Sequence, residues 1–200
     1  YDPFVLPLCF FELVACRLPA QMRYKQLNEI LNLNINFCQK VLKVALKEES
    51  NALLEQEAKA LESLHSEFIV DFEEILEMNG RTVLVLEKAG DQTLAALLQK
   101  DGVLSLDLLC RYGDDLLSAL VSLERNGVNH RDIKPDNIGI RTNTKKRNQL
   151  ILFDFSLTGV PIDNLKVGTE KYKDPSIFSR KPARWDVIAE RYSVAVTLHE

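Results

Sequence analysis

The chain has 200 residues, the size of one ordinary domain, and its apolar share of 46% and charged share of 27% are near the globular average. A buried core is therefore expected, and disorder is excluded as a description of the whole chain. The net charge of −4, from 25 basic and 29 acidic residues, gives no argument for nucleic acid or an anionic membrane as a partner.

Glycine is scarce and unevenly placed. The chain holds 8 glycines, and all of them lie at Gly80 or later. A glycine-rich phosphate loop is therefore excluded from the part of the chain that precedes Gly80.

The cysteines and the ends of the chain bear on its cellular setting. None of the four cysteines forms a C-x-x-C pair or has a histidine at metal-ligand spacing, so reduced thiols in the cytoplasm are expected. No run reaches ~18 apolar residues, and the apolar stretch from Phe4 to Ala15 lacks the basic flank of a signal peptide. Because the chain begins at Tyr1 and stops at Glu200 within an apolar, helix-like run, we expect a fragment of a longer parent chain with additional domains.

The first part of the chain predicts strands with one inserted helix. Residues 1–22 form an apolar extension with little periodicity, which is an extension proper, a remnant of an upstream domain or a mistranslated end. Hydrophobic periodicity then predicts strands over 23–30, 31–37 and 41–47, a helix over 50–64, and a strand pair over 68–77 and 81–87.

The second part of the chain predicts mostly helices. A short helix is expected over 93–100, a long one over 106–126 that ends at Gly127, a hairpin over 138–141 and 149–153, and a last helix from 189. Strands early and helices late indicate an α+β fold of two lobes, with a boundary near residues 87–91.

The segment His130-Arg131-Asp132-Ile133-Lys134-Pro135-Asp136-Asn137 carries the strongest chemical signal. It follows the long helix and precedes the hairpin, so it is expected on a loop held by rigid elements. Asp132 is an acid that accepts a proton from an attacking hydroxyl, and the amide oxygen of Asn137 is a hard ligand for Mg²⁺. Lys134 places a cation where it neutralises a transferring phosphoryl group.

Three more residues complete the candidate site. Asp154, in Asp154-Phe155-Ser156, ends an apolar strand and offers a second hard ligand. Lys47 ends a predicted strand and is suited to phosphate oxygens, and Glu57 on the next helix supplies the charge that would hold this lysine extended, with Glu55 as the fallback. The Lys–Glu pair alone is a weak signal, since such side chains are usually solvated.

These motifs together resemble the protein kinase family. The resemblance rests on Val44-Ala45-Leu46-Lys47, on the segment 130–137 and on Asp154-Phe155-Ser156, and it covers about residues 23–200. It implies a two-lobed kinase-like fold, with a small β-rich N-lobe over 23–87 and a helical C-lobe over 88–200 that is incomplete.

The resemblance also implies ATP and Mg²⁺ as cofactors and assigns the site residues. Asp132 is the expected base, and Lys134 is expected to neutralise charge. Asn137 and Asp154 are expected to bind the metal. The expected nucleotide-binding groups are Lys47, Glu57 and the backbone of Glu87 and Ala89.

Substrate and regulation follow from the same resemblance. Gly168-Thr169 looks like the family's substrate-docking turn, and Lys134 with Thr169 is the pattern of serine/threonine kinases, which implies a protein substrate. Arg131 suggests that a phosphate orders the following segment, and Thr158 is the favoured phosphosite, with an ordinary exposed threonine as the alternative.

The chain departs from the family at three places. The expected glycine-rich loop is missing, which indicates a defective copy, a divergent loop or a pseudokinase. Asp174-Pro175-Ser176 stands where the family has Ala-Pro-Glu, so the buried salt bridge of that glutamate cannot form. Glu190 stands where the family has the helix aspartate that braces the catalytic loop.

Several functions therefore compete. The leading hypothesis is an ATP- and Mg²⁺-dependent serine/threonine protein kinase; the others are an inactive pseudokinase or regulatory module, and a small-molecule kinase of the aminoglycoside type. The motifs Asn129 to Asp132, Asp154 to Ser156 and Ala189 to Tyr192 look like a narrower group, the large bacterial kinases of phage-defence islands of the phage-growth-limitation and BREX type. The basic tract 145–147 is interpreted as a solvated hairpin tip, with a docking patch as the alternative.

Overall fold

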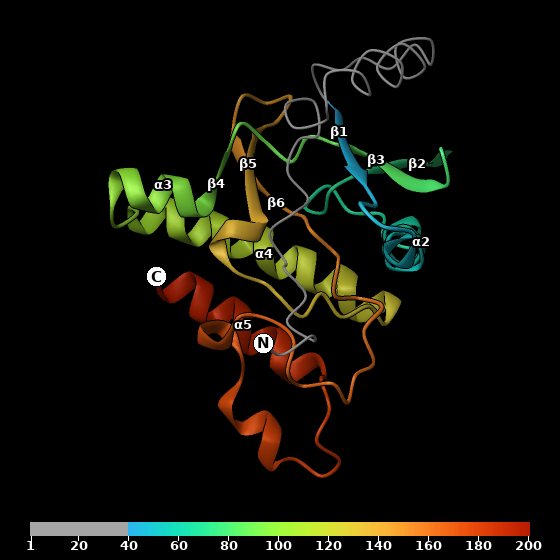
Figure 1. Cartoon of the computed structure of the whole chain (residues 1–200). Coiled ribbons are helices and arrows are strands. Elements are labelled where there is room, and N and C mark those ends of the chain that lie inside the picture. The colour runs from blue at the N-terminus through green and yellow to red at the C-terminus, as the bar shows by residue number, and fades with distance from the viewer. Residues whose placement is uncertain (1–39) are drawn as a thin grey trace. The chain divides into compact units, whose positions relative to one another are not determined.

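The structure is a computed structural model that describes residues 40–200. The strands expected over 23–30 and 31–37, the extension over 1–22 and three of the four cysteines lie outside the described residues. The described chain divides into two compact units, which are taken in turn (Figure 1): residues 40–55 with Phe72–Lys88, and Gln56–Asp71 with Ala89–Glu200.

The first unit contains a three-stranded antiparallel sheet in the order β1-β3-β2. Its strands are β1 (Lys40–Val44), β2 (Phe72–Met78) and β3 (Arg81–Glu87). The central strand β3 is buried along most of its length, as its continuous apolar run predicts. The turn between β2 and β3 has Asn79 at φ 52° and Gly80 at φ 74°, the left-handed backbone that a two-residue hairpin turn requires.

The strand predicted over 41–47 is wrong at its end. β1 stops at Val44, and Lys47 lies outside it, exposed, just before a short 3-10 helix, η3 (Glu48–Ser50). The reason is the length of the partner strand: Val44 pairs with Val83, and the Ala45 N–H donates to the carbonyl of Thr82 at 2.9 Å, near the turn where β3 begins.

The second unit is mostly helical. Its main helices are α3 (Leu94–Asp101), α4 (Leu106–Asn126) and α5 (Val187–His199), and it also contains all but the first five residues of α2 (Asn51–Glu62). A second sheet, in the order β4-β5-β6, is formed by β4 (Gln92–Thr93), β5 (Ile138–Thr142) and β6 (Asn148–Leu152). Three short 3-10 helices follow the loops: η4 (Pro135–Asn137), η5 (Glu170–Tyr172) and η6 (Pro175–Ser179).

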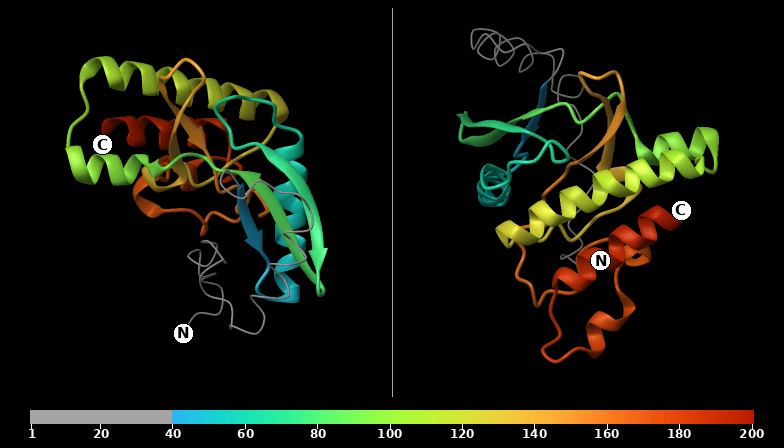
Figure 2. Two further views of the ribbon diagram at one scale, coloured as in Figure 1. Left: turned by 90° about the horizontal axis from the view of Figure 1, so that it is seen from above. Right: turned by 180° about the vertical axis from the view of Figure 1, so that it is seen from behind.

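Helix α4 is the rigid base of this unit, and it packs against β6 and α5 (Figure 2). The Ser105 hydroxyl caps its N-terminus by accepting from the Leu108 N–H at 3.3 Å, and Gly127 ends it at φ 64°. Its buried face is a stripe at helical spacing: Tyr112, Leu116, Ala119, Leu120 and Leu123. A Cβ at Gly113 would make an ordinary contact of 3.8 Å with Leu198, so glycine is tolerated there rather than required.

The hairpin β5–β6 places two loop ends side by side. Ile138 at the start of β5 pairs with Leu152 at the end of β6, and the Phe153 N–H donates to the carbonyl of Asn137 at 3.0 Å. The residues just before β5 and just after β6 are therefore neighbours, although the whole hairpin separates them in sequence.

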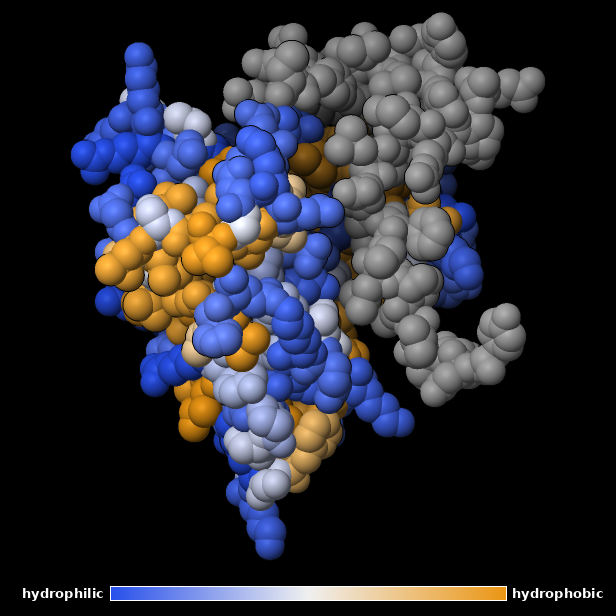
Figure 3. All heavy atoms as spheres, turned by 90° about the vertical axis from the view of Figure 1, so that its left-hand side faces the viewer, coloured by the Kyte–Doolittle hydropathy of each residue, from blue (hydrophilic) through white to orange (hydrophobic). Residues whose placement is uncertain are grey.

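The surface of the second unit has an apolar area, which Figure 3 shows from one side. Val103 and Leu106 are among the exposed large apolar side chains of this unit, and Val103 lines a pocket together with α3, the start of α4 and the end of α5. No helix among residues 40–200 is both long and apolar enough to cross a bilayer.

Candidate active site

Asp132 is the centre of the candidate site. Its side chain is 7% exposed, and its two oxygens are held from both sides. Oδ1 accepts from the Thr169 N–H at 2.9 Å and from the Thr169 hydroxyl at 2.7 Å. Oδ2 lies 2.8 Å from Lys134 Nζ and accepts from Asn137 Nδ2 at 3.0 Å. The structure thus brings together four of the residues predicted from the sequence.

The electrostatics of this cluster keep Asp132 ionised. Burial raises the pKa of its carboxyl, but the hydrogen bonds from Lys134 and Thr169 and the charge of Lys134 outweigh burial, so the pKa falls below the ordinary value of 3.8. Lys134 Nζ also donates to Thr169 Oγ1 at 2.8 Å, which closes a triangle of three side chains. An ionised and oriented carboxylate is suited to accept a proton from a hydroxyl.

The turn Gly168-Thr169 reaches Asp132 because of its glycine. Gly168 has φ +86°, and a Cβ at this position would lie 2.6 Å from the carbonyl oxygen of Arg131. A larger residue would therefore be strained in its backbone and would push Thr169 away from Asp132.

Asn137 and Asp154 lie next to each other through the β5–β6 hairpin described above. The Asn137 amide nitrogen donates to the carbonyl and carboxylate of Asp132, which leaves its amide oxygen as an acceptor directed elsewhere. Asp154 has φ 65°, a rare left-handed backbone for this residue type that indicates a constrained position. A carboxylate and an amide oxygen form a hard donor set, so these residues fit Mg²⁺.

The residues on the two sides of Asp154 are held by His130 and Glu57. Glu57 is 1% exposed, and its Oε1 accepts from the Phe155 N–H at 3.1 Å, whereas the fallback residue Glu55 is exposed. His130 Nε2 lies 2.9 Å from the Phe153 carbonyl, and its Nδ1 accepts from the Asp132 N–H at 3.2 Å, so the ring links the two motifs.

A brace behind the catalytic loop includes one residue that sequence reasoning missed. The Arg131 N–H donates to Glu190 Oε1 at 2.9 Å, as the position of Glu190 implies, and Trp185 Nε1 donates to the same oxygen at 2.7 Å. Trp185 is the only tryptophan of the chain and is 2% exposed; a tryptophan five residues before the acid was the available signal. Burial raises the pKa of Glu190 to about 7, although the Arg131 and Trp185 hydrogen bonds oppose the shift.

Glu190 is expected to make stability depend on pH. Its folded pKa of about 7 lies above the ordinary 4.5, so the folded state retains a proton that the unfolded state releases. The contribution to the free energy of unfolding is complete below pH 4.5 and declines by about 3 kcal/mol as the pH rises through 7. Denaturant unfolding from pH 4.5 to 8 of the wild type and of Glu190→Gln measures this, because the difference between their slopes isolates Glu190. Parallel curves would contradict the prediction.

The guanidinium of Arg131 is occupied by backbone carbonyls. Nη1 donates to Val160 at 2.5 Å and to Pro161 at 3.0 Å, and Nη2 donates to Asn164 at 2.5 Å. The side chain is 1% exposed and lies 5.5 Å from the ring of Trp185. The Thr158 hydroxyl donates to the Phe155 carbonyl at 2.8 Å.

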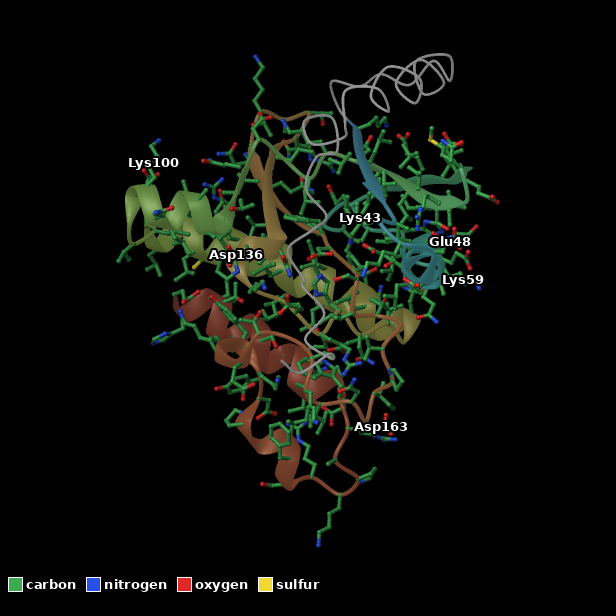
Figure 4. The ribbon with its side chains drawn as sticks, in the orientation of Figure 1. Lys43, Glu48, Lys59, Lys100, Asp136 and Asp163 are labelled. Carbon is green, nitrogen blue, oxygen red and sulfur yellow. The ribbon has the colours of Figure 1, made fainter. Side chains whose placement is uncertain are left out.

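The residues expected to bind the nucleotide are divided between the two units, with Lys47 and Glu87 in the first and Glu57 and Ala89 in the second. Lys43 lies within β1 opposite Leu84 and is 5% exposed, whereas Lys47 is exposed (Figure 4 labels Lys43). Leu86 is buried near the end of β3, and the following Glu87 carboxylate lies 3.9 Å from Lys40 Nζ. The predicted role of Lys47 assumed a lysine on a strand. Lys47 lies outside β1, whereas Lys43 lies within it.

The fold and the site define a kinase domain: a small sheet unit, a helical unit, and an acid and a lysine beside two oxygen donors that suit Mg²⁺. The family described as Protein kinase domain matches residues 30–200. The chain belongs to the protein kinase family.

The relatives include a bacterial protein of great length. The chain is 42% identical over 182 residues to the probable kinase PglW of Streptomyces coelicolor, covering 80% of this chain and 12% of that protein. It is 33% identical over 142 residues to CBL-interacting protein kinase 29 of Oryza sativa, covering 68% and 31%. It is 33% identical over 130 residues to the serine/threonine-protein kinase drp72 of Corynebacterium efficiens, covering 60% and 24%. The chain thus spans less than a third of each of these relatives.

Proposed function

We propose that this chain transfers the γ-phosphoryl group of ATP to a serine or threonine hydroxyl of a protein, with Mg²⁺. The observation that carries the proposal is the triangle of Asp132, Lys134 and Thr169, in which one carboxylate is ionised, oriented and tied to the docking turn. Retention of Asn137 and Asp154 beside it supports the use of a metal.

The chemistry assigned to the chain follows from these contacts. Asp132 accepts the proton of the substrate hydroxyl while the oxygen of that hydroxyl forms a bond to the γ-phosphorus. At the same time the bond between the γ-phosphorus and the β–γ bridging oxygen breaks, and ADP leaves. Lys134 neutralises charge on the phosphoryl group. Mg²⁺, when bound, neutralises phosphate charge, and Asn137 and Asp154 are the residues suited to hold it.

Lys43, rather than Lys47, is the lysine that we assign to the nucleotide phosphates. A strand side chain has a fixed direction, whereas an exposed lysine beyond the strand end does not. Glu57, which lies on the helix α2, remains our assignment for the partner of the lysine, and the backbone of Glu87 and Ala89 remains our assignment for the base.

The contacts among Asp132, Lys134 and Thr169 also determine how we rank the alternative functions. A small-molecule kinase has no need for a turn that docks a protein, and the contact of Thr169 with Asp132 favours a protein substrate. A pseudokinase would have no need for an ionised base beside two metal-binding oxygens, although the absence of glycine before Gly80 still favours that reading.

The deciding experiment is transfer of labelled phosphate from ATP to the protein itself and to generic protein substrates, with and without Mg²⁺. Incorporation that depends on Mg²⁺ and exceeds the Asp132→Ala control supports the proposal. Incorporation only into aminoglycosides or sugars would support the small-molecule kinase, and nucleotide binding without any transfer would support the pseudokinase.

The activation segment, by which we mean residues 154–175, is expected to be ordered without phosphate, because the guanidinium of Arg131 already has three carbonyl partners in it. Phosphatase-treated protein and the Thr158→Ala variant should keep activity within about twofold of the untreated protein. If phosphate did order this segment, it would form about 1–3 charge-assisted hydrogen bonds, and its removal would lower activity. Kinase assays after mass-spectrometric confirmation of dephosphorylation measure this. Loss of activity on dephosphorylation, restored by Thr158→Glu, would instead support Thr158 as the phosphosite.

The wider setting is proposed on similarity and composition. The likeness to PglW favours a place among the large bacterial kinases expected from the sequence, with further domains in the parent protein and a role in bacterial defence. A cytoplasmic location remains a prediction from the cysteine pattern, and Cys110, the one cysteine among residues 40–200, is free and exposed.

A further inference from the structure

The chain lacks the glutamate that normally ties the end of the activation segment to the rest of a kinase, since Ser176 stands in its place. The structure contains another ion-pair arrangement at this point. Arg180 lies between Asp174 and Asp186 and forms a salt bridge with each. We call these three residues the Arg180 clamp.

The contacts of the clamp use both terminal nitrogens of the Arg180 guanidinium. Nη1 donates to Asp186 Oδ1 at 2.5 Å, and Nη2 donates to Asp174 Oδ2 and, at 3.2 Å, to the Ser176 hydroxyl. The Asp174 side chain is 6% exposed and that of Arg180 is 19% exposed, so the pair is shielded from water. Shielded pairs are screened less by salt than surface pairs are.

Both aspartates also begin a helix. Asp174 Oδ1 accepts from the Ser176 N–H at 2.8 Å and so caps η6. Asp186 Oδ1 accepts from the Ile188 and Ala189 N–H groups, both at 3.0 Å, and so caps α5. A single arginine therefore fixes the spacing between the starts of two helices.

Each end of the clamp leads to the catalytic loop. Asp174 follows η5, which begins directly after Thr169, and Thr169 contacts Asp132. Asp186 begins α5, which carries Glu190, and Glu190 accepts from the Arg131 N–H. An apolar cluster lies between these segments and includes Leu165, Ile177, Trp185 and Ala189.

We propose that Arg180 is a positioning residue, which takes over the task of the absent glutamate by joining the end of the activation segment to the start of α5. The inference rests on the proposed function, because the segment so held is the one that would dock a protein substrate. Arginine suits this task, since its planar fork contacts two carboxylates at once whereas a lysine ammonium acts as a point charge.

The test compares Arg180→Ala and Arg180→Lys with the matched control Arg184→Ala, an exposed arginine of the same loop, in the full-length protein. For Arg180→Ala, kcat/KM for a protein substrate should fall about tenfold or more, because small misplacements of a docking segment are costly. The KM for ATP and the slow hydrolysis of ATP without protein substrate should stay within about twofold, because neither reaction needs a docked protein. Arg180→Lys should be intermediate.

A second measurement does not need activity. Hydrogen exchange of amides in residues 165–179 should become faster in Arg180→Ala and remain unchanged in the β5–β6 hairpin and in Arg184→Ala. The inference would be overturned if Arg180→Ala and Arg184→Ala gave the same kinetics and the same exchange rates. It would also be overturned if a folded Arg180→Lys protein lost phosphoryl transfer and ATP hydrolysis to the same extent. A wild type that transfers no phosphate while Arg180→Ala still shows faster local exchange would instead reject the proposed function and keep the clamp.

Discussion

Replacing Asp132 by asparagine is expected to lower the rate of phosphoryl transfer by about 10³-fold. Asparagine has nearly the same shape, and its one oxygen still accepts a hydrogen bond from either Thr169 or Lys134, but it has no carboxylate to receive the proton of the hydroxyl. The KM for ATP should change little, because Asp132 is assigned to the hydroxyl rather than to the nucleotide. Steady-state kinetics with a protein substrate measure both values.

The matched control is Asp136→Asn, which removes an exposed carboxylate four residues along the same loop and should leave the rate within about twofold (Figure 4 labels Asp136). A loss of less than tenfold at Asp132 would contradict its role as the base. The pH profile gives a second check. Since the pKa of Asp132 lies below 3.8, its protonation reduces activity only below that pH and leaves the rate unaffected between pH 5 and 8.

Replacing Lys43 by alanine is expected to reduce kcat/KM for ATP by about 10²-fold, whereas Lys47→Ala should have an effect within about twofold. The reason is position: Lys43 is fixed on β1 and buried, whereas Lys47 is exposed beyond the end of the strand. Kinetics at varied ATP concentration, together with binding of an ATP analogue, measure the two variants side by side.

The pair of lysine variants separates the assignment predicted from the sequence, Lys47, from the assignment that we make on the structure, Lys43. A large loss for Lys47→Ala with little loss for Lys43→Ala would restore the motif that ends at Lys47. Because Lys43 is buried, Lys43→Met serves as a second variant that keeps the volume of the side chain, and thermal unfolding of both shows whether the protein stays folded. Loss of ATP binding in a folded Lys43→Met protein is the expected result.

The absence of glycine before Gly80 bears on activity, since the family has its phosphate loop in the region that precedes residue 40, outside the described range. The two expected results above address it. A wild type with measurable transfer that both Asp132→Asn and Lys43→Ala abolish would show that the glycines are dispensable. A wild type with no transfer would favour the inactive module.

The sequence predicted most accurately the features that depend on local signals. The helix α4 begins and ends where Ser105, Gly127 and the apolar stripe indicate, and the turn at Asn79 and Gly80 has the backbone that these residue types favour. The motif around Asp132 was interpretable because five residue types in eight positions have a chemical reason to be there together. Its residues lie close together in sequence, so they lie close together in space whatever the packing of the rest of the chain.

What the sequence determined by itself was therefore the α+β class, the helices with their caps, and the catalytic loop with Asp132, Lys134 and Asn137. Only the tertiary structure decided which lysine lies on β1, because the length of a strand is set by its partner. Only the tertiary structure placed Arg131 on three carbonyls, Trp185 on Glu190 and Arg180 between two aspartates. Arg131 and Glu190 are 59 residues apart, and hydrogen bonds over such separations depend on how the chain packs, which no local pattern records.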